Sequence, residues 1–111
     1  MKATGKAILE QIQACAANGQ IRCSNHGYDE LAADALYFDE VVHGLSRAVI
    51  VEAYPDYPKG PSLLALQMDS SGALIHALWG IPKGYDCPAV LITAYRPDPD
   101  IWNDTFTRRK Q

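Results

Sequence analysis

The side chains best suited to acid–base chemistry in this chain are its three histidines, and one of them interrupts an apolar run. His76 lies within GALIHALWG, residues 72–80. Because an imidazole titrates near neutral pH, His76 is a candidate general acid or base. The alternative is a half-buried histidine that bonds to a backbone carbonyl. For His26 and His43, which fall in expected helices, a structural role is the simpler interpretation.

Other strands supply polar side chains that could join His76. Glu52, Gln67 and Tyr95 each occur in an apolar, β-branched or aromatic run. Alternate residues of a strand share one face of a sheet. If the strand register allows it, we expect these three side chains to meet His76 on an uncovered face. A register slip of one residue would move a strand's side chains to the opposite face.

Two further segments could contact a substrate. The loop YPDYPKGP offers Tyr57 and Lys59, which could stack a base and bind a phosphate, or could simply cover a sheet edge. Arg96 could stabilise phosphate charge or pair with a carboxylate. We expect Trp102 and Phe106 to dock the C-terminal tail onto the core.

The sequence predicts that helices, followed by strands, position these residues. Apolar spacing predicts an N-terminal helix over residues 4–18, ended by Asn18-Gly19, and a helical segment over 24–44. Ser24 is its expected N-cap, with Tyr28 and Leu31 facing the core. Strands are predicted at 47–54, 62–68, 73–79 and 89–95, followed by a tail over 96–111. The expected fold is therefore α+β, with about four strands in an antiparallel meander and the helices on one face.

Composition narrows the function classes. The length of 111 residues favours a single domain, residues 1–111. The net charge of −3 argues against a protein that binds nucleic acid through an overall basic field. Basic residues nevertheless gather near the C-terminus. Three cysteines without a C-x-x-C pair predict free thiols and a cytoplasmic location. Cys23 and His26 could form half of a zinc site, but no second half follows, so we expect neither metal nor cofactor. No membrane span is expected.

The order of several short motifs resembles a known family. SNHGYDELAADAL, VVHG, VEAYPDYPKGPSLLALQ, GALIHALWG and AVLITAYRPDPDIW are together similar to the bacterial family of unknown function DUF4258, from about Ser24 to Trp102. Family members resemble the small RelE and barnase-like ribonuclease toxins, and some are paired with zinc-finger antitoxins. The resemblance implies a curved sheet whose open face binds RNA. It marks the candidate catalytic residues His26, Glu52, His76, Tyr95 and Arg96.

Two functional hypotheses follow. One is a metal-independent endoribonuclease of a toxin–antitoxin pair, in which His76 acts as base or acid, Glu52 or Tyr95 as its counterpart, and Arg96 stabilises phosphate charge. Lys59, Gln67 and Tyr57 would bind the substrate. The other is a non-catalytic module, or a homodimer, whose sheet face or edge receives a protein. Catalysis requires the catalytic groups to converge in a solvent-open hollow, whereas burial of His76 would favour the module.

Overall fold

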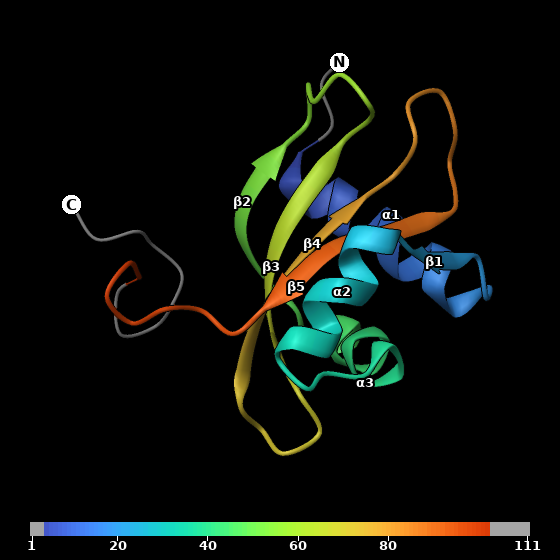
Figure 1. Ribbon diagram of the computed structural model, residues 1–111. Coiled ribbons are helices and arrows are strands. Elements are labelled where there is room, and N and C mark those ends of the chain that lie inside the picture. The colour runs from blue at the N-terminus through green and yellow to red at the C-terminus, as the bar shows by residue number, and fades with distance from the viewer. Residues whose placement is uncertain (1–3, 103–111) are drawn as a thin grey trace.

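The computed structural model describes residues 4–102 and contains the predicted helices followed by the predicted strands, with one additional strand between the first two helices (Figure 1). The elements are α1 (Gly5–Ala17), β1 (Ile21–Cys23), α2 (Asn25–Ala33), α3 (Phe38–His43), a short 3₁₀ helix η1 (Gly44–Arg47), β2 (Val49–Tyr54), β3 (Ser62–Met68), β4 (Leu74–Gly80) and β5 (Ala89–Tyr95). The α+β class is confirmed. No helix within residues 4–102 is long and apolar enough to cross a membrane.

The sheet has five strands in the order β1-β5-β4-β3-β2. Strands β2 to β5 form the predicted antiparallel meander, while β1 pairs in parallel with β5. The expectation of about four strands therefore missed β1, which has only three residues. Such a short segment has no periodicity of its own, and its place is fixed by pairing with a strand far along the chain.

Local signals explain the helix boundaries. The hydroxyl oxygens of Thr4 and Ser24 accept hydrogen bonds from backbone amides in the first turns of α1 and α2, as N-caps do. The helix α2 lies close to β5, because a Cβ on Gly27 would be only 2.9 Å from the carbonyl oxygen of Leu91. Leu31 is buried as predicted, but Tyr28 is 54% exposed and does not face the core. Its ring packs beside Phe38 at the surface.

All three helices cover one face of the sheet (Figure 1). The core between the layers contains Ile12 of α1, Leu31 of α2 and Val41 of α3, packed against the buried side chains of Ile75 and Trp79 on β4. The opposite face of the sheet has no helix on it within the described residues, and we call it the helix-free face. It carries Leu64, Leu66 and Met68 of β3, Leu74, His76 and Leu78 of β4, and Thr93 and Tyr95 of β5.

A β-bulge divides β2 between these faces. Ile50 pairs with Ala65 and packs on the core, but the register shifts before Glu52, which pairs with Leu64. The extra residue Val51 breaks the simple alternation. Glu52 therefore lies on the helix-free face, whereas strict alternation along β2 would place it with Ile50.

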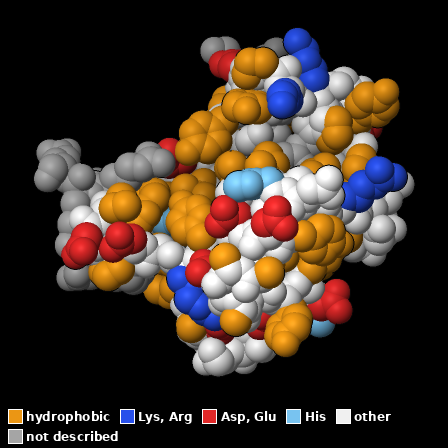
Figure 2. Space-filling model, in the orientation of Figure 1, with side chains coloured by type: hydrophobic (Ala, Val, Ile, Leu, Met, Phe, Trp, Pro, Cys, Tyr) orange, Lys and Arg blue, Asp and Glu red, His pale blue; other side chains and the backbone are white. Residues whose placement is uncertain are grey.

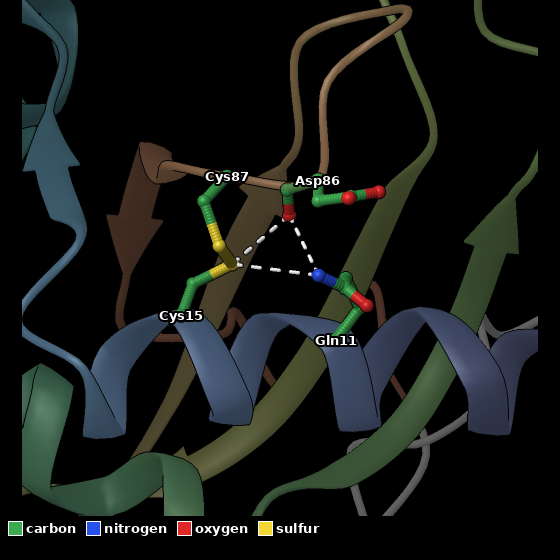
Figure 3. Close-up of a disulfide and its surroundings, with 4 residues drawn as sticks. All are labelled: Gln11, Cys15, Asp86 and Cys87. Carbon is green, nitrogen blue, oxygen red and sulfur yellow. Dashed lines mark hydrogen bonds between the residues drawn. A yellow bond between two sulfur atoms is a disulfide. The ribbon is translucent and has the colours of Figure 1, made fainter.

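The cysteines differ from the prediction of free thiols. Cys15 of α1 and Cys87, in the segment before β5, form a disulfide bond across 72 residues of sequence (Figure 3). The side-chain amide of Gln11 donates a hydrogen bond of 2.7 Å to the carbonyl oxygen of Asp86 beside it. Cys23 is a free thiol, and partial burial raises its pKa. Local sequence does not indicate this pairing, because Cys15 and Cys87 are neighbours only after the sheet and α1 have packed.

Candidate functional site

His76 lies on the helix-free face, but it is closed off from solvent. Its exposed fraction is 0%, and the indole of Trp102 meets its ring edge-on with centroids 4.4 Å apart. The hydroxyl of Tyr95, its partner on β5, lies 3.3 Å from its Nδ1 atom. This is a long hydrogen bond for a hydroxyl group. The expected pairing of His76 with Tyr95 is therefore present, and the expected solvent-open hollow around His76 is not.

Gln67 does not belong to this group, contrary to the prediction. In the β3–β4 register Leu66, not Gln67, lies opposite His76, so Gln67 points to the helix-covered side. It is buried there, where its amide nitrogen donates to the carbonyl of Val41 at 2.6 Å and its amide oxygen accepts from the Trp79 indole at 2.8 Å. Gln67 joins a helix to the sheet.

Glu52 shares the helix-free face with His76 but lies two strands away. Strand β3 separates them, and neighbouring strands are about 4.8 Å apart, so their backbones are about 10 Å or more from each other. The carboxylate of Glu52 accepts a hydrogen bond from the hydroxyl of Tyr54. In this structure Glu52 therefore does not serve as an acid–base counterpart directly beside His76.

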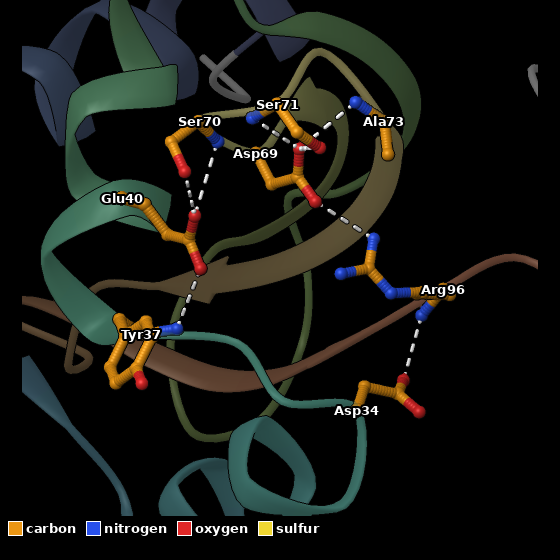
Figure 4. A network of polar contacts seen from close by, with 8 residues as sticks. All are labelled: Asp34, Tyr37, Glu40, Asp69, Ser70, Ser71, Ala73 and Arg96. Carbon is orange, nitrogen blue, oxygen red and sulfur yellow. Dashed lines mark hydrogen bonds and ion pairs between the residues drawn. The ribbon is translucent and has the colours of Figure 1, made fainter.

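Arg96 is held at the turn between β3 and β4. Its guanidinium donates to the Asp69 carboxylate at 3.0 Å, and its backbone amide donates to Asp34 at 2.8 Å (Figure 4). Asp69 also accepts from the Ser71 hydroxyl and from the Ala73 amide. The pKa of Asp69 is lowered from 3.8 to about 2, mainly by the hydrogen bond from the Ser71 hydroxyl and also by those from the Ala73 amide and Arg96. The alternative that Arg96 pairs with a carboxylate is thus confirmed.

The same turn is tied to α3. The Glu40 carboxylate accepts hydrogen bonds from the Tyr37 amide at 2.8 Å and from the Ser70 amide and hydroxyl (Figure 4). The pKa of Glu40 is lowered mainly by the hydrogen bonds from the Tyr37 and Ser70 backbone amides. The hydrogen bonds to the carboxylates of Asp69 and Glu40 thus fix the turn and tie it to α3 and to Arg96, which makes it a structural cluster.

The remaining predicted site residues lie in two other places. His26 is exposed in the first turn of α2, with its Nε2 atom 3.6 Å from the Glu30 carboxylate. Tyr57 and Lys59 are exposed in the loop between β2 and β3. The eight predicted side chains are therefore distributed over the molecule, and His76 and Tyr95 are the pair shown in contact. Phe106 and the basic residues Arg108, Arg109 and Lys110 lie outside the described residues.

Sequence reasoning missed the two side chains that organise this face. Trp102 was expected to dock on the core, but it docks on His76, where it is 4% exposed. Asp69 was not among the predicted site residues. The one signal for Trp102 was its large apolar side chain after the proline-rich stretch, which indicates docking without indicating where.

A mostly apolar groove of about 490 Å³ lies between α3 and η1 on one side and the β3–β4 hairpin with the start of β2 on the other. Val49 and Met68 in its lining are 51% and 55% exposed, and Leu66 and Leu74 are partly buried. Glu40, His43 and Asp69 also line it. Arg47 at its border forms no ion pair within the described residues. Exposed apolar side chains around a concavity are typical of a binding surface.

Comparison with known proteins supports one assignment. The family DUF4258, domain of unknown function, matches residues 23–96. The chain belongs to the DUF4258 family. The matched region begins at Cys23 and includes α2, α3 and strands β2 to β5, while α1 and Trp102 lie outside it. No curated protein and no solved structure matches the chain.

Within residues 4–102, no group of three or more histidine, cysteine or acidic side chains could hold a metal ion. Cys23 and His26 are thus not completed to a metal site by described neighbours. The two clearest features of this DUF4258 chain are the closed His76–Tyr95 pair and the open groove.

Proposed function

We propose that this protein is a binding module that holds a partner protein in the groove between η1 and the β3–β4 hairpin, and that it does not cleave RNA. The observation that supports this proposal is the complete burial of His76 under Trp102. Metal-free RNA cleavage needs a base, an acid and a cation around one phosphodiester. A phosphodiester cannot reach a buried imidazole, and Arg96 is already bound to Asp69.

The groove supports the binding part of the proposal. Its lining offers exposed Val49 and Met68, and Arg47 lies in it without an ionic partner among the described residues. The carboxylates of Glu40 and Asp69 in the same lining are already bonded to Ser70 and Arg96. A protein segment with apolar side chains would cover Val49 and Met68, and a carboxylate on it would pair with Arg47. Such a segment fits the usual pattern of an apolar interface centre with a polar rim.

A second candidate is the endoribonuclease of a toxin–antitoxin pair, acting in the cytoplasm and inhibited by a small zinc-finger antitoxin. One observation favours it, the hydrogen bond between His76 and Tyr95, because two titratable groups in contact could exchange protons with a substrate. Trp102 would have to move away before RNA could bind.

The catalytic part is tested with the purified chain, a long RNA and a chelator, analysed by denaturing electrophoresis. We expect intact RNA with the wild type and with Trp102→Ala, which uncovers His76. We also expect no growth arrest when either protein is expressed from an inducible promoter. Cleavage or arrest that disappears in the additional His76→Gln variant would establish the ribonuclease instead.

The binding part is tested by placing a charge in the groove. Met68→Glu is compared with Tyr28→Glu, because Met68 and Tyr28 are almost equally exposed, 55% and 54%, while Tyr28 lies on α2. After cross-linking in cells, we expect one defined protein to be captured by the wild type and by Tyr28→Glu but not by Met68→Glu. Equal capture by all three would refute the assignment to the groove, and a product of twice the chain mass would identify a homodimer.

A further inference from the structure

A second surface lies at the opposite end of the sheet from the β3–β4 turn. It is formed by the loop of residues 55–61, between β2 and β3, and the loop of residues 81–88, between β4 and β5. We call it the two-loop platform. From its exposed side chains we propose that the platform binds single-stranded nucleic acid, a function separate from the groove and independent of the proposal above.

The two loops are bonded into one unit. The Lys83 amide donates to the Lys59 carbonyl at 2.9 Å, and the Ile81 amide donates to the Pro61 carbonyl at 3.0 Å. Gly60 has a φ of +131°, and a Cβ there would be 1.9 Å from the carbonyl oxygen of Ile81. Only glycine allows the loops to approach this closely.

The second loop is also anchored at its far end. Cys87 is bonded to Cys15 of α1, and Gln11 donates to the carbonyl of Asp86 (Figure 3). A surface that is already ordered loses little conformational freedom when a ligand binds. The backbones of the two loops are therefore held in fixed relative positions.

Aromatic and cationic side chains are exposed together on this unit. Tyr57 is 49% and Tyr85 is 72% exposed, and Lys59 and Lys83 are both exposed. Figure 2 shows basic side chains beside hydrophobic ones at this end of the molecule. Tyrosine rings can stack on unpaired bases while lysines bind the phosphates between them, which is how single strands are bound without sequence preference.

The distribution of charge supports an anionic ligand here despite the net charge of −3. Four basic side chains among residues 4–102 form no ion pair: Arg22, Arg47, Lys59 and Lys83. Three of them lie at the platform end of the sheet, because Arg22 pairs with Val90 at the start of β5. Asp56 and Asp86 are also exposed there, so the excess of positive charge is small, and we expect weak, salt-sensitive binding.

The test is fluorescence anisotropy with labelled oligouridylate, oligothymidylate and a duplex over a series of salt concentrations. We expect both single strands to bind and the duplex to bind more weakly, because paired bases cannot stack on the rings. Tyr57→Ala and Tyr85→Ala should each weaken binding about ten-fold. Lys59→Ala and Lys83→Ala should each lower the slope of log affinity against log salt by about 0.7.

Arg47→Ala is the matched control, since Arg47 also forms no ion pair among residues 4–102 and lies at the other end of the sheet. It should bind as the wild type does. Absence of binding, or equal weakening by Arg47→Ala and the lysine variants, would overturn the assignment. Tighter binding to polyglutamate than to either oligonucleotide would also overturn it, in favour of an acidic protein. RNA binding without cleavage leaves the proposed function intact, and cleavage by a chain that binds through the platform would refute only the proposed function.

Discussion

The buried Gln67 network allows a direct comparison between a structural and a substrate-binding role. In the structure the amide of Gln67 satisfies two buried groups, the Val41 carbonyl and the Trp79 indole N–H. Gln67→Leu keeps a similar volume but leaves both groups without a partner. Each buried polar group that loses its hydrogen bond costs about 1–3 kcal/mol, so we expect a loss of about 3 kcal/mol of unfolding free energy.

The assay is urea unfolding followed by circular dichroism, without reductant so that the disulfide stays closed. Gln13→Leu is the matched control, because Gln13 is half-buried and donates one bond, to the Leu45 carbonyl at 2.8 Å. It should cost about 1 kcal/mol or less. If Gln67→Leu and Gln13→Leu were equally mild, the network would contribute little and Gln67 would again be available for another role.

Two further predictions concern pH and redox state. Because the pKa of Asp69 in the folded chain is about 2, below its ordinary 3.8, its contribution to stability is complete above about pH 4 and is lost as the pH falls toward 2. The urea midpoint of Asp69→Asn should therefore fall less over this range than that of the wild type, and parallel curves would contradict the Arg96 and Ser71 contacts. Opening the disulfide that spans 72 residues, with Cys15→Ser and Cys87→Ser together, should cost about 4 kcal/mol of unfolding free energy. A wild type whose urea midpoint is unchanged by reductant would contradict that expectation.

The parts of the fold that depend on short-range signals were predictable from the sequence. Thr4 and Ser24 cap their helices, α1 ends before Gly19, and the β3–β4 turn follows Asp69. Each of these features is decided within a few residues by a hydrogen bond between a side chain and the backbone, by a backbone hydrogen bond or by a positive φ. The number of strands was not decided in this way, because β1 is a strand only through its pairing with β5.

The candidate site depended on register, and register is a long-range property. Alternation correctly separates Leu66 from Gln67 within β3, but it cannot say which of them lies opposite His76. The bulge in β2 then moved Glu52 relative to Ile50. One residue of difference on one strand was enough to remove Gln67 from the predicted cluster, as expected from the two-residue period of a strand.

The environment of His76 provides a structural reason for a histidine in the middle of an apolar strand. An aliphatic residue could fill the space under Trp102, but it could not accept or donate a bond to the hydroxyl of Tyr95. An imidazole offers a flat ring for the edge-on contact with the indole and a nitrogen for that hydroxyl. The same side chain thus satisfies an apolar and a polar neighbour at once. Because packing and hydrogen bonding already account for His76, its presence alone does not require catalysis, and the case for a ribonuclease depends on whether Trp102 leaves this position.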